Sequence, residues 1–331
     1  MKKLIAILTL ILTVFSLSAS AEGPLVVYTS MPQSVTDPLL AAFTEKTGIA
    51  VDLITAGGGE LMSRIRSEAD NPQGDVMLSG TISNCTGFQD YFAAHTSPNE
   101  DAVQEAHKNV EGTMTRFDVI SSVLIVNTDL IGDIQVAGYA DLLNPELKGR
   151  IAMADPGKAS SAFEHLVNML EDMGNGDAEA GWDYAAAFCA QLDGKLLSSS
   201  SAVYRGVADG EFAVGLTSEG SAANAIAAGA KNLAIIYMKE GVIFRGDGVY
   251  IIKGCKNEES AKAFIDFCTS YETQLMCQNE LYMRSVRSDV TGSQVLSDLS
   301  EINVREDDLQ TVIEKKGEWI QRFNDVYIDQ Q

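Results

Sequence analysis

Short apolar runs alternate with amphipathic stretches over the first third of the chain. Mainly apolar runs at residues 25–28, 50–54 and 74–78 are each typical of a buried strand. Between them, residues 36–47 and 60–69 carry apolar side chains at helical spacing. Strand, helix, strand, helix, strand in segments of this length predicts right-handed crossovers and a parallel sheet.

The alternation continues to the C-terminus without a repeat, a low-complexity tract or a Pro-rich linker. A long β-branched run at residues 117–127 predicts a strand that crosses between two lobes. Further strands are expected at 151–154, 212–216, 233–237 and 248–252. Helices are expected at 160–170, 202–210, 221–228, 260–279 and 307–326, with a short helix and turn at 139–148. We therefore expect two lobes joined by extended crossings rather than by a flexible tether.

The first 21 residues have the pattern of a secretory signal peptide. Lys2 and Lys3 precede an uncharged apolar stretch at 4–17, and residues 19–21 read Ala-Ser-Ala, a small-residue cleavage pattern. An N-terminal membrane anchor is disfavoured because the apolar run is short for a bilayer span. No cysteine marks a lipid attachment site. We expect cleavage near Ala21 and an exported, periplasmic protein.

Composition and charge narrow the function classes. The apolar content of 46% and the charged content of 21% are those of a globular chain long enough for two lobes. The formal net charge is -22, and loss of the leader makes it more negative still. Such a chain repels nucleic acid and anionic membranes, so we expect neither as a partner. We also expect a monomer.

Cysteines and histidines do not form a metal-binding pattern. The five cysteines include no C-x-x-C, and the three histidines are scattered, so we expect no metal site and no cofactor. Most cysteines are interpreted as small buried apolar residues. Cys268 and Cys277 fall on opposite faces of the helix expected at 260–279, so they should not pair unless that helix breaks.

Small and hydroxyl-bearing residues follow each of the first three strands. In parallel sheets ligands bind at the carboxyl ends of strands, which here carry Ser30 with Gln33, then the glycine run, then Ser79 with Gly80. The run Gly57, Gly58 and Gly59 precedes a helix, whose free amides suit a phosphate or carboxylate. The ordinary alternatives are a tight turn for the glycines and helix capping for the hydroxyls.

The second lobe offers a similar set of groups. Its hydroxyls are Ser160, Ser161, Ser198, Ser199, Ser200 and Ser201, and capping again explains some of them. Glu219 and Asp247 lie near strand ends, where each could accept hydrogen bonds from ligand hydroxyls or pair with an amine. The alternative for both is a solvated surface acid. We expect Arg284 and Arg287 to form salt bridges, and Trp182 and Trp319 to pack in the core.

Several segments, taken in order, resemble one protein family. They are VVYTS at 26–30, LNPELKGRIA at 143–152 followed by Asp155-Pro156, SSSSAVYRGVADGEFAVG at 198–215, DGV at 247–249 and RSVR at 284–287. Together they resemble the type II periplasmic solute-binding proteins of ABC importers, in the branch that contains ferric-ion, hexose-phosphate and phosphonate receptors.

The resemblance implies an α/β fold of two lobes, each a mostly parallel sheet flanked by helices, with the ligand cleft between them. Lobe 1 would comprise residues 25–120 and 245–290, lobe 2 residues 121–244, and residues 291–331 would pack on the lobes as C-terminal helices. It implies a non-enzymatic receptor that captures a small anionic organic solute, a phosphorylated sugar or a phosphonate, and delivers it to a membrane permease. Tyr204 and Glu219 join the ligand-binding residues on this basis.

Two alternatives stay open. The first is a ferric-ion receptor of an iron importer, although the adjacent tyrosine pair of that branch is replaced here by Thr217-Ser218-Glu219-Gly220. The second is an exported hydrolase, but the chain has no H-E-x-x-H, no G-x-S-x-G and no Walker loop. We therefore assign no catalytic residue.

Overall fold

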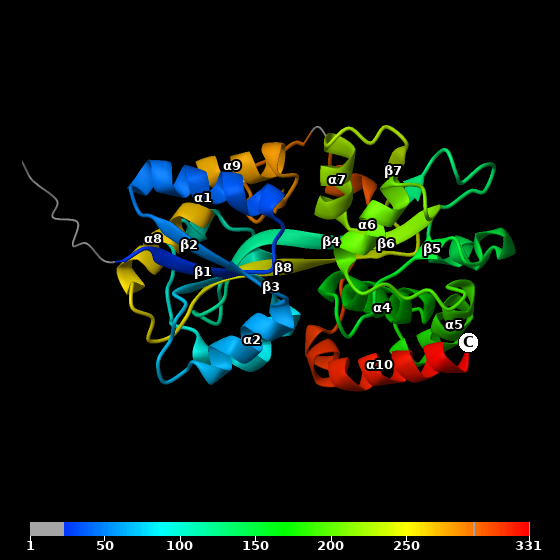
Figure 1. Cartoon of the computed structure of the whole chain (residues 1–331), viewed down its shortest axis with the longest axis horizontal. Coiled ribbons are helices and arrows are strands. Elements are labelled where there is room, and N and C mark those ends of the chain that lie inside the picture. The colour runs from blue at the N-terminus through cyan, green and yellow to red at the C-terminus, as the bar shows by residue number, and fades with distance from the viewer. Residues whose placement is uncertain (1–22, 294, 331) are drawn as a thin grey trace, which may run out of the picture.

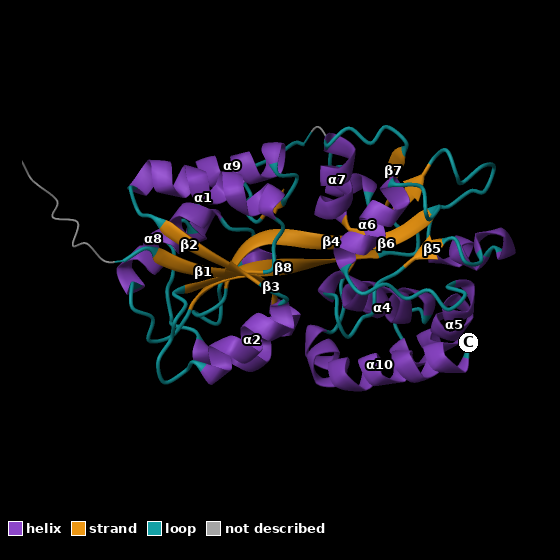
Figure 2. Ribbon diagram, viewed as in Figure 1, coloured by secondary structure: helices purple, strands orange, loops and turns teal. Residues whose placement is uncertain are grey.

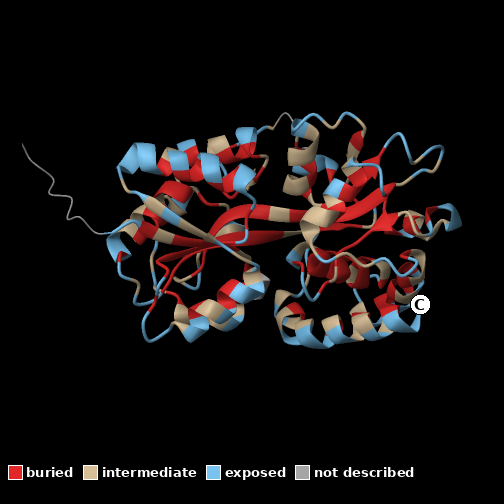
Figure 3. Ribbon diagram, viewed as in Figure 1, coloured by how far each residue is buried: buried red, intermediate tan, exposed pale blue. Residues whose placement is uncertain are grey.

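One mixed sheet runs the length of the molecule, with helices on both of its faces (Figures 1 and 2). The structure is a computed structural model that describes residues 23–293 and 295–330, so the expected leader lies outside it. The strand order is β2-β1-β3-β8-β4-β6-β5, with β10 beside β8 and both β7 and β9 beside β4. Most strand residues are buried, and the helices turn their exposed faces outward (Figure 3).

The elements have the following bounds. The strands are β1 (Leu25–Thr29), β2 (Val51–Thr55), β3 (Val76–Thr81), β4 (Thr115–Asn127), β5 (Ile151–Ala152), β6 (Val214–Ser218), β7 (Leu233–Ile236), β8 (Val242–Ile251), β9 (Arg284–Ser285) and β10 (Val304–Arg305). The helices are α1 (Gln33–Thr47), α2 (Gly58–Ser67), α3 (Ile82–Cys85), α4 (Ser160–Met173), α5 (Ala178–Gln191), α6 (Ser200–Ala208), α7 (Glu219–Ala227), α8 (Glu258–Cys268), α9 (Tyr271–Glu280) and α10 (Leu309–Asp329).

The first three strands are parallel, as predicted from their spacing. Alternate side chains of these strands point to opposite faces, so each face receives its own helices. Leu39 and Phe43 of α1 pack on one face, and Leu61 and Ile65 of α2 pack on the other. Burial of one such side chain contributes roughly 1.5–3 kcal/mol, so both faces hold the sheet in place.

Two long strands connect the halves of the molecule. We call the part built on β1–β3, α1–α3, α8 and α9 the β1 half, and the part built on β5–β7, α4–α7 and α10 the β6 half. β4 pairs with β8 and β9 through its first seven residues and with β6 and β7 through the rest. In Figure 1, β4 and β8 pass from one half into the other. The strand predicted at 117–127 therefore reaches both halves.

The core of the β6 half places α4, α5 and α10 on one side of the sheet (Figure 1). Trp182 and Trp319 are buried in this core, as predicted. α5 was not predicted from the sequence. The strand expected at 248–252 begins earlier, at Val242, because its first residues pair with β10 and β4.

The single helix expected at 260–279 is wrong. The chain forms α8 and α9 instead, separated at Thr269 and Ser270, where Ser270 is extended and its hydroxyl caps the N-terminus of α9. Cys268 and Cys277 lie on the two separate helices and, like the other three cysteines, are free thiols. Four of the five cysteines are buried, as the sequence interpretation expected for most of them.

Within residues 23–293 and 295–330, no helix has both the length and the apolar character needed to cross a membrane.

Candidate functional site

The carboxyl ends of β1 and β3 bring together three of the predicted site residues. The Ser30 and Ser79 hydroxyl oxygens lie 2.8 Å apart, and the Ser30 amide donates to Ser79 Oγ at 3.1 Å. A side chain at Gly58 would begin 3.8 Å from Ser30 Oγ, so the start of α2 lies against the same hydroxyls. These contacts follow from the parallel register, which sets the strand ends side by side.

Ser79 and Gly80 hold an unusual backbone conformation. Their φ angles are 107° and 110°, a region that side chains other than hydrogen rarely adopt. At position 80 a Cβ would also meet the Cys85 sulfur at 2.7 Å, which requires glycine. The Tyr250 hydroxyl donates to the Gly80 carbonyl at 2.5 Å. Strain of this kind costs on the order of 1–3 kcal/mol and is retained mainly at functional sites.

Three helices begin near these loops without a capping side chain. α1, α2 and α4 start after Pro32, Gly57 and Ala159, and within the described part of the chain no side chain accepts from their first amides. Helix capping therefore does not explain Ser30, Ser79, Ser160 or Ser161. Uncapped amides at a helix N-terminus carry a partial positive charge and favour an anion.

The predicted hydroxyls of the β6 half divide into two kinds. Ser161 Oγ lies 2.6 Å from Ser200 Oγ, which joins the starts of α4 and α6. Ser199 caps α6 by accepting from the Ala202 amide, and its hydroxyl lies 3.2 Å from Ser201 Oγ. Ser160 and Ser198 are exposed beside them. Ser199 thus fits the capping alternative. The hydroxyls of Ser161 and Ser200 cap neither helix and stay candidates for ligand binding.

The remaining predicted residues are placed as follows. Gln33, Gly57 and Gly59 are exposed at the starts of α1 and α2. The half-buried ring of Tyr204 packs on the core of the β6 half, with the Arg205 guanidinium 5.9 Å from its centroid. The ligand role of these four predicted residues stays a prediction.

Glu219 is a buried acid held by two partners. Arg284 donates to both of its oxygens, each at 2.7 Å, and the Tyr237 hydroxyl donates to Oε1. Burial and the adjacent carboxylate raise the pKa of Tyr237 to about 12. Arg287 pairs with Asp289 at 2.8 Å, so the salt bridges expected for Arg284 and Arg287 are confirmed. Glu219 therefore ties α7 of the β6 half to β9, which pairs with the first part of β4.

Asp247 lies on β8 and faces a residue that sequence reasoning missed, Asp118 on β4. Both side chains are buried. Burial and the charge of Asp247 raise the pKa of Asp118 well above its ordinary value, and burial raises the pKa of Asp247 to about 7. The sequence does show Asp118 as an acid inside the β-branched run at 117–127. That it faces Asp247 could be found only from the register of the two strands.

A second unpredicted group joins the two halves beside the strand ends. The Thr81 hydroxyl donates to Glu164 of α4 at 3.4 Å. Arg245 of β8 donates to Glu164 and also to Asp307, with its Nη1 3.3 Å from Asp307 Oδ1. All three charged side chains are buried, so the ion pairs fix α4 against the crossing strand.

A cavity of about 770 Å³ lies elsewhere, between β8 and the segment that leads from β9 to α10. None of the predicted site residues lines it. Each of its five arginines lies beside a carboxylate. Arg116 binds Glu111, Arg245 binds Glu164 and Asp307, Arg284 binds Glu219, Arg287 binds Asp289, and Arg305 lies 3.9 Å from Asp172. Because these charges are compensated, the cavity is a poorer anion site than the strand ends.

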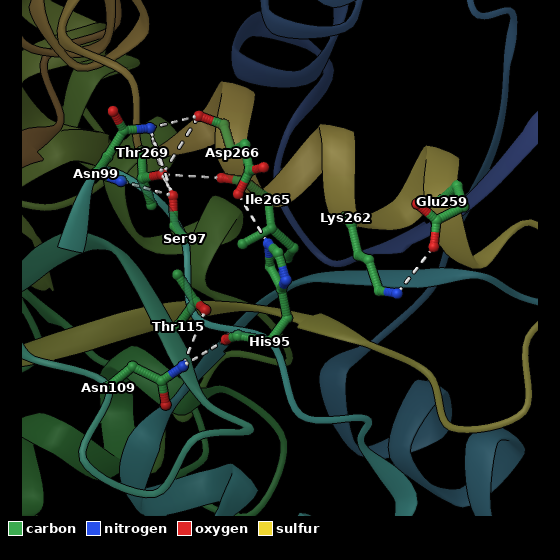
Figure 4. A network of polar contacts seen from close by, with 10 residues as sticks. All are labelled: His95, Ser97, Asn99, Asn109, Thr115, Glu259, Lys262, Ile265, Asp266 and Thr269. Atoms are coloured by element: carbon green, nitrogen blue, oxygen red, sulfur yellow. Dashed lines mark hydrogen bonds and ion pairs between the residues drawn. The ribbon is translucent and has the colours of Figure 1, made fainter.

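His95 and His165 hold structural positions. In Figure 4, His95 Nε2 lies 2.7 Å from Asp266 Oδ1 of α8, while Ser97 Oγ bonds to Thr269 Oγ1 at 2.8 Å rather than to the imidazole. This network fastens residues 95–109 to α8. His165 is buried between the Tyr139 hydroxyl and the Thr217 carbonyl, and burial lowers its pKa to about 4. Across the described residues, no three His, Cys, Asp or Glu side chains gather as a metal site.

Comparison with known proteins identifies relatives among transport proteins. Iron uptake protein A1 of Synechocystis is 26% identical over 280 residues, 80% of this chain and 76% of that protein. A putative 2-aminoethylphosphonate-binding periplasmic protein of Salmonella typhimurium is 25% identical over 266 residues, 76% of this chain and 74% of that protein. These named relatives are transport binding proteins rather than enzymes.

A solved structure shares the fold over nearly the whole chain. It is the periplasmic binding protein AfuA from Actinobacillus pleuropneumoniae with fructose-6-phosphate bound, at a TM-score of 0.82, 24% identity, 92% of this chain and 99% of that chain. The predicted type II periplasmic binding protein fold is confirmed by this similarity. The model of the bacterial extracellular solute-binding protein family matches residues 39–298. The chain therefore belongs to the bacterial extracellular solute-binding proteins.

Proposed function

We propose that the solute is a small anionic organic molecule, either a phosphorylated sugar or a phosphonate or related organophosphate. The observation that carries the proposal is the pair of hydroxyl clusters, Ser30 with Ser79 and Ser161 with Ser200, beside the uncapped starts of α2 and α4. Backbone amides and hydroxyls of this kind bind phosphate oxygens without a bound cation. The relatives support it, since AfuA was solved with fructose-6-phosphate and the Salmonella protein is named for a phosphonate.

Capture would work by closure of two lobes. We place lobe 1 at residues 25–120 and 245–290, lobe 2 at 121–244, and the bending region where β4 and β8 pass between them. A solute that contacts both hydroxyl clusters binds the closed form more tightly than the open one, and this difference drives closure. The closed protein then presents a surface to the permease.

The cellular setting completes the proposal. The expected leader is removed near Ala21 and the mature monomer works in the periplasm, without enzymatic activity.

The Synechocystis relative favours ferric ion as the alternative solute. Against it, Glu219 already accepts hydrogen bonds from both Tyr237 and Arg284, and no tyrosine pair follows β6.

Titration calorimetry tests the proposal directly. Glucose-6-phosphate and ethylphosphonate are titrated into the mature protein, and we expect at least one to bind. Ser79→Ala should weaken that binding by about 10-fold or more, because a hydrogen bond to a charged group contributes roughly 1.5–3 kcal/mol. Ser67→Ala, an exposed serine on the outer part of α2, is the matched control and should bind as the wild type does.

Three results would contradict the proposal. The anionic-solute proposal is contradicted if neither class of solute binds and native mass spectrometry finds no small molecule carried through purification. A visible charge-transfer band on addition of Fe(III) would favour the iron alternative. Release of phosphate from the added esters would point to a hydrolase.

A further inference from the structure

Two buried carboxyl groups share one small space on the strands that cross the molecule. Asp118 of β4 and Asp247 of β8 are register partners, with exposed fractions of 6% and 5%. Residues directly opposite each other in an antiparallel pair have Cβ atoms about 5 Å apart. Two carboxylates at this spacing repel each other strongly in a dry site, so the arrangement needs a physical reason.

No cation of the described chain neutralises the pair. Asp118 Oδ1 has no hydrogen-bond partner among the described residues. Among the described residues, Asp247 accepts from backbone groups, the Gly248 amide at 3.0 Å and the Gly80 backbone. The groups that influence the pair from the packed helices are Cys85 of α3, Glu164 of α4 and Cys277 of α9, none of which is a cation.

The basic residues around the pair are already engaged. Arg245, on the same strand as Asp247, donates to Glu164 and Asp307, and Arg116, on the same strand as Asp118, pairs with Glu111. Lys316 of α10 interacts with Glu164 and Cys85. The raised pKa values of Asp118 and Asp247 agree with this lack of compensation. A buried carboxylate with a free oxygen and no compensating cation is a costly arrangement that a cation from outside the chain would relieve.

The acid pair is close to the proposed anion site. Asp247 is the register partner of Thr81, which stands two residues after Ser79 on β3. Two residues of strand span at most about 7 Å between Cα atoms, so Ser79 and Thr81 lie within that distance of each other across the irregular backbone at Gly80. A single small organic molecule can span it.

We propose that Asp118 and Asp247 form a subsite for a cationic group, so that the preferred solute is a short organophosphate or phosphonate that also carries an ammonium group. The anionic end contacts Ser30, Ser79 and the start of α2, and the ammonium group donates to the carboxylates. This inference rests on the proposed function. It adds that the acid pair selects a zwitterion over a solute that carries hydroxyls alone.

The test compares solutes that differ by one amine. Calorimetry at pH 7.5 measures glucosamine-6-phosphate against glucose-6-phosphate, and 2-aminoethylphosphonate against ethylphosphonate. In at least one pair the amine should bind about 10-fold tighter or more, the range expected of a charge-assisted contact. At pH 6 the advantage should shrink, because protons then occupy more of the carboxyl pair.

Variants assign the effect to the two acids. Asp118→Asn and, separately, Asp247→Asn should remove most of the amine advantage while the amine-free solute keeps its affinity. Asp52→Asn removes an exposed acid from the same half and should keep the full advantage. The comparison in the wild type stands even where a variant fails to fold.

The possible outcomes separate the two proposals. If the amine-free member of a pair binds as tightly as the amine, or if both Asn variants keep the advantage, the cation subsite is wrong and the anionic-solute proposal survives. If no member of either pair binds, the anionic-solute proposal fails first, and the subsite fails with it.

Discussion

Asp172 of α4 is a buried acid without a hydrogen bond to either oxygen among the described residues. Its nearest cation is Arg305, whose Nε lies 3.9 Å from Oδ1. Burial raises its pKa from an ordinary 3.8 to about 6. The folded state therefore holds this proton more tightly than the unfolded state, so the associated stability is present at low pH and is lost as the pH rises through about 6.

Asp172→Asn should make the protein more stable at pH 8, because the amide cannot ionise in the buried site. The gain in the free energy of unfolding should be on the order of 2 kcal/mol at pH 8 and near zero at pH 4. Urea unfolding of both proteins at the two pH values measures it. Asp183→Asn, an exposed acid of α5, is the control and should show no such pH dependence. If Asp172→Asn and the wild type are equally stable at pH 8, the buried Asp172 carboxylate does not destabilise the folded protein.

At the residue scale, the predictable part of the site was the part fixed by strand ends. Ser30, Gly58 and Ser79 could be placed because parallel strands bring their carboxyl ends to one edge. Asp118 could not be placed, since only the register with β8 reveals that it faces Asp247. The partners of Glu219 were likewise hidden, because Arg284 lies 65 positions away in the chain.

At the scale of elements, α4 and α5 pack with their backbones in close approach at a glycine. A Cβ at Gly181 of α5 would lie 2.3 Å from the Leu170 carbonyl oxygen of α4, closer than any real contact. Backbone atoms cannot move aside as a flexible side chain can. The glycine therefore sets the distance between these two helices.

Gly181→Ala should lower the free energy of unfolding by roughly 1–3 kcal/mol, the usual cost of overpacking. Gly317→Ala is the opposite case, because Gly317 is an exposed helical residue of α10 with nothing within 4 Å of its Cβ position. It should stabilise the protein by about 0.5–1 kcal/mol through helix propensity. Chemical denaturation compares the two. If the two substitutions change the stability equally, the close contact between α4 and α5 does not exclude a side chain at Gly181.

Elements with a clear hydrophobic period could be predicted, and those without one could not. α1, α2 and α10 each show an apolar stripe. α5 carries mostly small and apolar residues on all sides, which gives no face to recognise. The break between α8 and α9 was missed because the apolar pattern continues across it, and only the extended backbone of Ser270, with its hydroxyl cap, ends the first helix.

On the scale of the whole molecule, three polar links among the described residues connect the halves besides the crossing strands. Glu219 of α7 binds Arg284 of β9, Thr81 of β3 bonds to Glu164 of α4, and Asn224 of α7 donates to the Leu281 carbonyl after α9. The first is a bidentate pair with side-chain exposures of 2% and 12%. Breaking a buried pair of this kind leaves an uncompensated charge.

Glu219→Gln should lower the free energy of unfolding by about 3–5 kcal/mol, since Arg284 then stays buried without its charge partner. Asp289→Asn disrupts a more exposed ion pair, the one with Arg287. It should change the free energy of unfolding by less than about 1 kcal/mol. Thermal or urea unfolding of the two variants gives the comparison. Similar stability of both variants would show that the Glu219 pair does not bind the halves together.

The two long crossing strands also limit which movements the halves can make. β4 and β8 are hydrogen-bonded to each other from Thr115 to Ser121, so neither can advance along its axis without breaking the ladder. Sliding and free rotation are excluded, and only flexing or twisting of a two-stranded ribbon is left. Under the proposed closure of the lobes, each cycle would therefore return the same atoms to the same places, which keeps the geometry of the solute site reproducible from one round of transport to the next.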